Sequence, residues 1–347
     1  MKKLVAILLV LALVLSFAAC APKADAPAAD APAADAPAAD APAADAPAAD
    51  APADAELPLV GMSHLGVGTN NYTTIYTETL YDLMETEFNG QVELYIVDSQ
   101  GDAEKQLSDI DDLIEMECDV VILWPVSATA VVPGVKALYD AGIPIINTNS
   151  GVDVSAQEML TAFSGPSDYN QGYQAGEAMV AALGGEGKVV ELSGLAGYDT
   201  AIQRTKGFTD AIAGTNIEII ASEPADWSTE KAQTIMETFI AKYGKDINGI
   251  YCADDGISAG ALNALDAAGM NDGTIAITSP TLFASGYDAI AEGKQYASVL
   301  QSPIEDAKLA LTLAVEVALG GTVEYDNRIP TYIVDKNNYS EFDRPTW

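Results

Sequence analysis

Between residues 57 and 347, short continuous apolar runs alternate with longer segments in which apolar residues recur every three or four positions. Nine of these runs are rich in β-branched residues and predict strands: 57–62, 92–98, 119–125, 143–148, 188–194, 217–223, 247–254, 274–280 and 296–300. In one intervening segment, apolar side chains stand at Ala103, Leu107, Ile110 and Ile114, the spacing of one helical face. Continuous apolar strands that alternate with amphipathic helices are typical of doubly wound parallel sheets. Because so many strands exceed one comfortable sheet, we expect an α/β fold with two doubly wound, parallel-sheet lobes.

The first twenty residues have a different pattern, which predicts a signal peptide over residues 1–19. A short cationic start at 1–3 precedes an apolar run at 4–15 that is too short to span a bilayer comfortably. Small residues then lead to Cys20, and this arrangement resembles the bacterial lipobox. We therefore expect cleavage before Cys20, lipid attachment to its thiol, and a lipid anchor that holds the chain on the extracytoplasmic face of the cell membrane.

A low-complexity segment follows Cys20. The pentapeptide Ala-Pro-Ala-Ala-Asp repeats through residues 26–50, so proline interrupts any regular helix and no large side chain offers a core. If residues 21–56 were fully extended as polyproline II, they would reach about 110 Å at roughly 3.1 Å per residue. The composition predicts that residues 20–56 are a lipidated cysteine followed by a disordered, Ala/Pro/Asp-rich tether.

The charge balance and the scarcity of certain residue types exclude several classes of function. The chain carries 51 acidic against 16 basic side chains, a formal net charge of −35, which argues against nucleic acid as a partner because phosphate binding needs Lys and Arg. The single histidine, His64, excludes His-rich zinc sites, and three cysteines are too few for a disulfide scaffold. We expect no metal and no cofactor, and we expect Cys118 and Cys252 to be buried free thiols.

One motif is typical of an enzyme. Residues 256–260 read Gly-Ile-Ser-Ala-Gly, which fits the nucleophile elbow of hydrolases. That fold needs its histidine after the serine, whereas His64 lies far before Ser258 in the chain. We therefore predict no enzymatic activity and interpret the segment as the start of a helix that packs closely on its strand.

Polar and aromatic residues gather where the predicted strands end. In open parallel sheets the ligand lies beyond the carboxyl ends of the strands. Here these ends carry amides, carboxylates and two of the three tryptophans, Trp124 and Trp227. Flat aromatic faces suit the C–H face of a sugar ring, and bidentate polar groups suit its hydroxyls. The pattern predicts a site for a small polyhydroxylated molecule.

Six stretches of the chain carry a further indication: 97–114, 137–146, 169–179, 191–208, 221–227 and 251–269. Together, and in this order, they resemble bacterial sugar-binding proteins of the ribose-binding type, in the type I periplasmic-binding-protein superfamily. The resemblance implies the solute receptor of an ABC importer, whose two lobes, joined by a three-strand hinge, close a cleft on the ligand. It also implies a first lobe over 57–164 plus 302–331, and a second lobe over 165–301 plus 332–347.

The resemblance extends to individual residues. Asn71 matches the family's asparagine after the first strand, Arg204 the arginine of its R-x-x-G-F motif, and Trp227 its aromatic position after Pro-Ala-Asp. Gln301 matches a glutamine at the last hinge strand, and Asp254 stands where the family usually has asparagine. The resemblance implies that these residues contact the ligand.

Other positions depart from the ribose-binding pattern. Trp124 replaces an asparagine, Asn149 stands where ribose binders have an aspartate, and Pro280 replaces another aspartate, while Tyr72 adjoins a replaced aromatic pair. These departures put ribose itself in doubt. The complete set of predicted ligand-binding residues is Asn71, Tyr72, Trp124, Asn149, Arg204, Asp226, Trp227, Asp254, Pro280 and Gln301.

The acidic globular region favours a neutral sugar or sugar-like polyol, because a multiply anionic ligand would be repelled. We expect a monomer that captures this ligand by cleft closure and delivers it to a membrane complex of ABC permease and ATPase. Two alternatives stay open at this point. In the first, the protein is a receptor for a furanosyl signalling molecule. In the second, it is a ligand sensor that works with a membrane kinase or chemoreceptor and not with an importer.

Overall fold

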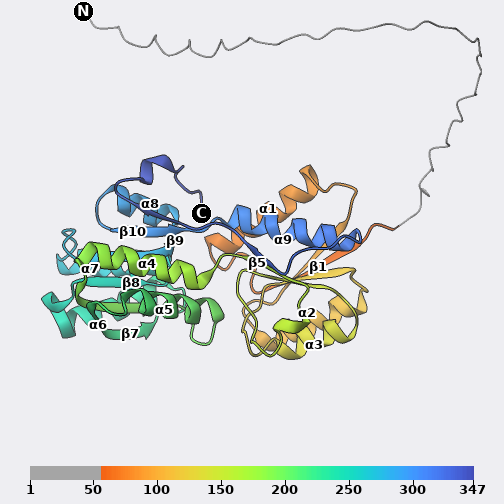
Figure 1. Cartoon of the computed structure of the whole chain (residues 1–347), viewed down its shortest axis with the longest axis horizontal. Coiled ribbons are helices and arrows are strands. Elements are labelled where there is room, and N and C mark those ends of the chain that lie inside the picture. Colours follow the sequence, from red (N-terminus) through yellow and green to blue (C-terminus); the bar gives the residue numbers. More distant parts are fainter. Residues whose placement is uncertain (1–55) are drawn as a thin grey trace, which may run out of the picture. The chain divides into compact units, whose positions relative to one another are not determined.

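Two sheets flanked by helices make up the part of the chain that the computed structural model describes, residues 56–347 (Figure 1). The predicted signal peptide, Cys20 and nearly all of the predicted tether lie outside the described residues. The described residues belong to one compact unit. Within them, no helix is both long enough and apolar enough to cross a membrane.

The first sheet has six strands, all parallel, in the order β11-β5-β4-β3-β1-β2. The strands are β1 (Leu59–His64), β2 (Glu93–Asp98), β3 (Val120–Leu123), β4 (Ile145–Thr148), β5 (Ala162–Gly165) and β11 (Asp326–Arg328). Helices α1 (Asn71–Thr86) and α9 (Pro303–Ala318) pack on one face, and α2 (Ala103–Glu115) and α3 (Val132–Asp140) pack on the other. We call this sheet and these helices the first lobe.

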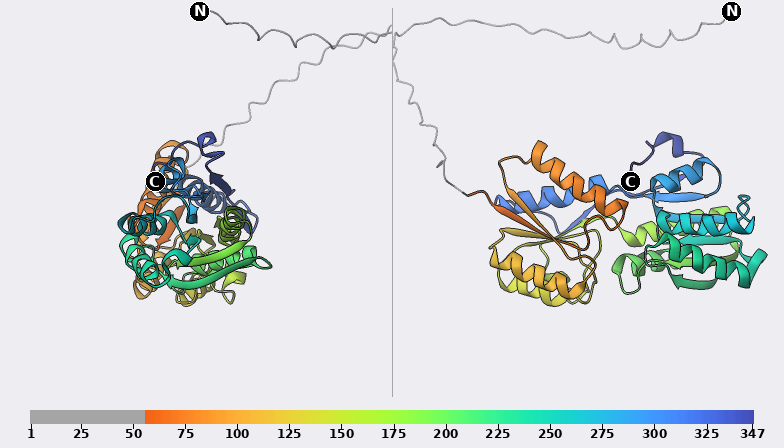
Figure 2. Two further views of the ribbon diagram at one scale, coloured as in Figure 1. Left: turned by 90° about the vertical axis from the view of Figure 1, so that its left-hand side faces the viewer. Right: turned by 180° about the vertical axis from the view of Figure 1, so that it is seen from behind.

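The second sheet also has six strands, in the order β12-β10-β9-β8-β6-β7. The strands are β6 (Glu186–Ser193), β7 (Asn216–Pro224), β8 (Gly249–Cys252), β9 (Ala276–Thr281), β10 (Ala297–Leu300) and β12 (Tyr332–Asp335), of which β12 runs antiparallel to β10. The helices are α4 (Asp168–Leu183) and α5 (Asp199–Ile212) on one face, α6 (Thr229–Tyr243) and α7 (Asp255–Ala268) on the other, and α8 (Ala284–Ala291) beside β10. We call this sheet and its helices the second lobe (Figure 2).

Local sequence explains many of these elements. All four residues of β3, Val120–Leu123, are fully buried, which is why that strand is a continuous apolar run with helices on both faces of its sheet. Helix α2 begins after Asp102, whose carboxylate accepts hydrogen bonds from the backbone N–H groups of Glu104 and Lys105. The buried side chains of α2 include Ile110 and Leu113, which face the sheet.

The predicted α/β fold with two doubly wound, parallel-dominated sheets is confirmed, and every predicted strand is present. The pattern missed β5, β11 and β12, three strands of at most four residues. The lobes draw on the same chain segments as the predicted ones, and the exact lobe boundaries stay a prediction. Cys118 and Cys252 are buried and free, as expected.

The chain passes between the two sheets at three points: after β5, after β10 and after β11. The second of these connections, between β10 and α9, contains Gln301 and the N-cap residue Ser302. Residues at these connections can therefore touch both lobes.

Candidate functional site

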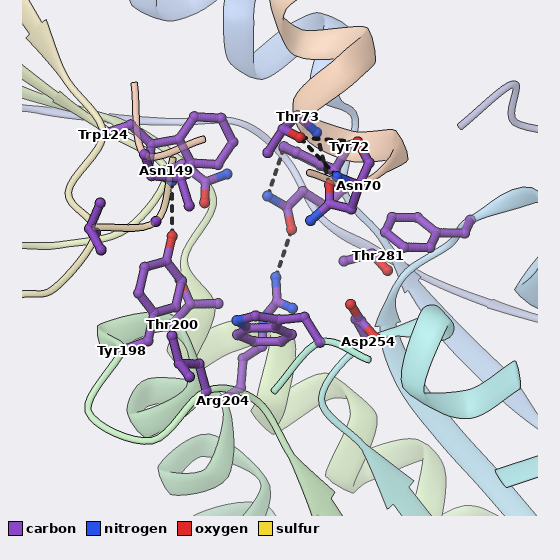
Figure 3. A pocket seen from close by; sticks show the side chains of 17 residues that line it. Asn70, Tyr72, Thr73, Trp124, Asn149, Tyr198, Thr200, Arg204, Asp254 and Thr281 are labelled. Carbon is purple, nitrogen blue, oxygen red and sulfur yellow. Dashed lines mark hydrogen bonds between the residues drawn. The ribbon is translucent and has the colours of Figure 1, made fainter. Parts of the chain in front are cut away.

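A cavity of about 130 Å³ is lined by seventeen residues, most of which follow the carboxyl ends of strands (Figure 3). The first lobe contributes Leu65, Asn70, Tyr72, Thr73, Gly101, Trp124, Val126 and Asn149. The second lobe contributes Leu195, Tyr198, Thr200, Arg204, Trp227, Asp254, Thr281 and Phe283, and Gln301 comes from the connection between them. One water needs at least roughly 10–15 Å³ of such space, so the cavity has room for several waters or for a small ligand.

Seven of the ten predicted site residues line this cavity: Tyr72, Trp124, Asn149, Arg204, Trp227, Asp254 and Gln301. They come from segments spread over most of the described chain, and the fold brings them together at the strand ends. Their contact with a ligand stays a prediction.

The other three predicted residues do not line the cavity. Asn71 is the exposed first residue of α1, whereas its neighbour Asn70 reaches the cavity and caps the helix by accepting a hydrogen bond from the Thr73 N–H at 2.9 Å. Asp226 is exposed, and its carboxylate pairs with the ammonium group of Lys231.

Pro280 is buried inside β9, because that strand continues through Thr281, and it is Thr281 that reaches the cavity. The neighbouring strand β8 pairs with β9 only at Ala276, Ile277 and Thr278. Pro280 therefore lies beyond the β8–β9 ladder, while on the other side of its strand it stands opposite Val299 of β10.

Sequence reasoning missed several lining residues, of which Tyr198 and Phe283 are the bulkiest. Tyr198 stands inside the stretch 191–208 that carries the family resemblance, and Phe283 follows the end of β9 by two residues. An aromatic residue in a loop after a strand was the available signal in both cases.

Trp124 is a wall of the cavity that is also part of the first-lobe core. Its side chain is only 3% exposed, and its ring packs on Tyr76 with centroids 4.8 Å apart and on His64 at 5.0 Å. Its indole N–H donates to the Tyr198 hydroxyl of the second lobe at 2.9 Å. Trp124 therefore joins the two lobes beside the cavity.

His64 does not line the cavity. It is the last residue of β1 and is fully buried, and burial lowers its pKa to about 4. Its Nδ1 accepts a hydrogen bond from the Gly66 N–H at 3.0 Å, which fits a neutral ring. His64 supports Trp124 from below the cavity wall.

Trp227 is half-buried and belongs to the second-lobe wall. Its ring lies edge-on to Tyr198, with centroids 6.0 Å apart, and packs against the apolar cluster under α6 and α7. Gly194 makes room for the indole, because a Cβ atom there would lie 2.2 Å from a ring carbon. The backbone of Trp227 is left-handed, with φ of 60°.

Arg204 is the cation of the cavity lining, and most of its N–H groups already have partners. Its Nε donates to Asp168 and to Gln171, each at 3.2 Å, and one Nη donates to the Ala253 carbonyl at 2.8 Å. The other Nη donates to Gln171 at 2.8 Å and to Gln301 at 2.7 Å. Burial raises the pKa of Asp168 to about 6, although the Arg204 charge opposes that shift.

Asp254 caps α7 at the edge of the cavity. Its Oδ1 accepts a hydrogen bond from the Ile257 N–H at 2.7 Å. Burial raises the pKa of Asp254 to about 6, with the helix-end hydrogen bond and Arg204 acting in the opposite direction. The second carboxylate oxygen leaves an acceptor for a ligand hydroxyl.

Ser258 has no geometry for nucleophilic catalysis. Its hydroxyl is buried in α7 and donates to Gln295 at 2.5 Å. Across residues 56–347, no three His, Cys, Asp or Glu side chains are grouped so that they could hold a metal ion. The cavity lining offers aromatic faces for stacking, and amide, hydroxyl and carboxylate groups for hydrogen bonds.

Known proteins share this architecture. A family model described as a periplasmic binding protein domain matches residues 65–322. A ribose import binding protein of Haemophilus influenzae is 29% identical over 231 residues, 67% of this chain and 77% of that protein. A xylitol-binding protein of Mycolicibacterium smegmatis is 27% identical over 290 residues, 79% of this chain and 81% of that protein. The crystal structure of a galactofuranose binding protein, 27% identical, superposes with a TM-score of 0.76 over 82% of this chain and 96% of its own. Because the family model spans well over half of its residues, the chain belongs to the periplasmic binding protein family.

Proposed function

We propose that this protein captures a neutral sugar or sugar-like polyol between its two lobes and delivers it to an ABC importer. The observation that carries the proposal is the cavity, in which aromatic side chains from both lobes face amide, hydroxyl and carboxylate groups. A ligand that touches both lobes binds best when they are together, so it shifts the protein toward the closed conformation. The names of the ribose, xylitol and galactofuranose relatives support this class of ligand. The protein has no enzymatic step in this proposal.

The charges around the cavity support a ligand without negative charge. Among the residues that line it, Arg204 alone is basic, and its donors are largely used by Gln171, Gln301 and Asp168. A sugar phosphate would lose its hydration and find few free donors in return. A neutral polyol exchanges water for amide and carboxylate partners at a smaller electrostatic cost.

The proposal includes a location outside the cytoplasm. Members of the family are extracytoplasmic proteins, and the sequence before residue 57 fits a signal peptide, a lipidated Cys20 and a tether. In this proposal the tether lets the two lobes reach a permease while the lipid holds the chain at the membrane. The protein works as a monomer.

A binding screen tests the proposal. The purified protein is heated with D-ribose, xylitol, myo-inositol, D-galactose and a galactofuranoside, and hits are measured by calorimetry. Binding at a hundred times Kd adds about 2.7 kcal/mol to the free energy of unfolding, so a true ligand raises the melting temperature clearly. D-Ribose 5-phosphate is the charged control. The proposal fails if no sugar or polyol stabilises the protein, or if the phosphate binds more tightly than its neutral parent.

A further inference from the structure

A buried carboxylate, Asp306, lies directly behind the wall of the cavity. It is fully buried near the start of α9 and is not among the lining residues. Its Oδ2 accepts a hydrogen bond from the Tyr72 hydroxyl at 2.8 Å and another from the side-chain amide of Asn149 at 2.7 Å. Both donors line the cavity, so Asp306 touches the site through two of its residues.

The hydrogen bonds of Tyr72 continue toward the second lobe. The Tyr72 hydroxyl accepts from Nε2 of Gln301 at 2.7 Å, and Oε1 of Gln301 accepts from Arg204 at 2.7 Å. A carboxylate can only accept hydrogen bonds, so an ionised Asp306 makes Tyr72 a donor toward it. The lone pair that remains on the hydroxyl then accepts from Nε2 of Gln301, while Arg204, which can only donate, holds the Oε1 end of the same amide.

The backbone holds this arrangement in place. Asn149 is in the left-handed region with φ of 62°, and Gly165, with φ of 137°, lies against it. A Cβ atom at Gly165 would come within 2.9 Å of the backbone nitrogen of Asn149 and within 3.2 Å of Oδ1 of Asp306. Strand β5 therefore approaches the Asn149 backbone closely, at the position from which the Asn149 side-chain amide reaches the carboxylate.

We propose that Asp306 is a positioning residue for the ligand. Its ionised carboxylate orients the Tyr72 hydroxyl and the Asn149 amide directly, and it acts on the Nε2 end of the Gln301 amide through Tyr72. Protonation of the carboxylate replaces charge-assisted hydrogen bonds by weaker neutral ones and frees these groups to rotate. The part of this inference that concerns ligand binding rests on the proposed function. The orientation of the side chains by Asp306 does not depend on that function.

The surroundings of Asp306 bring the pKa of its carboxyl group close to neutral pH. Burial raises its pKa to about 7, and the nearby Asp168 acts in the same direction. Helix α1 presents Tyr72 and Tyr76, whose pKa values burial raises well above 10, so both stay neutral. At the end of β1, His64 has a pKa of about 4 and is neutral as well. Strands β3, β4 and β5 contain no titratable side chain, and the acidic side chains of α1 and the other charged residues at the start of α9 are exposed.

The first experiment follows the side-chain amide resonances of Asn149 and Gln301 by NMR in the ligand-free protein between pH 5.5 and 8.5. We expect both to shift with a midpoint near pH 7, and we expect Asp306→Asn to abolish both titrations. Tyr72→Phe keeps the carboxylate and removes the hydroxyl, so Gln301 should lose its titration while Asn149 keeps it. Glu305→Gln removes an exposed charge from the same helix and should change neither.

The second experiment measures the affinity for D-ribose, xylitol and myo-inositol by calorimetry. If only the ionised form binds, affinity at pH 6.5 is about fourfold weaker than at pH 8, and Asp306→Asn removes this difference. Amide resonances that do not titrate near pH 7, or that titrate equally in Asp306→Asn, overturn the positioning role. An affinity that depends equally on pH in both proteins overturns its part in binding. If none of the three probes binds, the proposed function fails, and the NMR experiment still decides the orientation.

Discussion

The side chains of the cavity are largely held by one another. Arg204 is bound by Asp168, Gln171 and the Ala253 carbonyl, while the Trp124 N–H is used by Tyr198. Groups that are fixed before the ligand arrives lose little conformational entropy on binding. The Arg204 side of the cavity is therefore pre-organised within its own lobe, whereas the bond between Trp124 and Tyr198 needs the two lobes together.

At the residue scale, we predict that Trp227→Ala weakens binding of a sugar ligand by about 1–3 kcal/mol, roughly tenfold to more than a hundredfold. The half-buried indole should cost less folding stability than the about 3–5 kcal/mol typical of a core tryptophan. Calorimetry with the best ligand of the screen gives the affinity, and urea unfolding gives the stability. Trp347→Ala removes an indole that does not line the cavity and serves as the control. A well-folded Trp227→Ala protein with unchanged affinity would remove this side chain from the site.

At the scale of elements, the loops that follow the strands decide where the walls stand. The loop between β6 and α5 carries Gly194 below the Trp227 ring and Tyr198 beside it. The start of α7 sets Asp254 at the cavity edge through a cap. Each wall residue thus depends on a backbone segment that is short and closely packed.

We predict that Gly194→Ala displaces the Trp227 indole and weakens ligand binding by about tenfold or more, because the added methyl would overlap the ring. The matched control in the same loop is Gly197→Ala. Gly197 has φ of 81° and open space around its Cα, so its substitution should cost about 1 kcal/mol of stability through strain and leave affinity unchanged. Ligand-induced tryptophan fluorescence and calorimetry on both variants measure the effect. Equal affinity of the two variants would contradict it.

At the scale of the whole molecule, buried carboxyl groups outnumber buried cations around the site. Asp168, Asp254, Asp255 and Asp306 are all buried, and Arg204 is the buried cation beside them. Burial raises the pKa of each of these carboxyl groups above its usual value. The surface adds to this imbalance, because the chain as a whole has a net charge of −35.

The raised pKa values predict a protein that is more stable at mildly acidic pH. Between pH 4 and 7 the folded state binds more protons at these groups than the unfolded state, so the free energy of unfolding falls as pH rises. His64 acts in the opposite direction, because burial lowers its pKa to about 4 and the unfolded state binds more protons at this group. One pKa unit corresponds to about 1.4 kcal/mol, and the four carboxyl groups outweigh the single histidine, so we expect a net loss of a few kcal/mol between pH 5 and pH 8. Urea unfolding at the two pH values measures it, and Asp306→Asn should reduce the difference. A protein that is more stable at pH 8 would disprove the prediction.

The anchor is a separate prediction at this scale. We expect labelled palmitate to enter the full chain in a bacterial host and to be absent from Cys20→Ala, because the sequence before Cys20 resembles a lipobox. Both proteins should bind the same sugar with equal affinity, since the cavity is formed by residues after position 64. Equal labelling of the two proteins would exclude lipid attachment at Cys20.

The sequence by itself determined the fold class and most of the strands. Strands such as β3 are buried on both faces, so their apolar runs are visible without any knowledge of neighbours. The rule that ligands lie beyond the carboxyl ends of parallel strands then led to Trp124, Asn149 and Asp254, which all line the cavity. The fold class and these strands could be predicted because the information for them is local in the chain.

Only the tertiary structure decided which neighbour of a strand end faces the cavity and what holds it there. Whether Asn70 or Asn71 reaches inward depends on where α1 begins, a choice that a cap hydrogen bond makes. Asp306 has no motif around it, and its partner Tyr72 lies 234 residues away in the chain. Such a contact exists because α1 and α9 pack on the same face of one sheet, and packing of segments that are distant in sequence leaves no periodic trace in either of them.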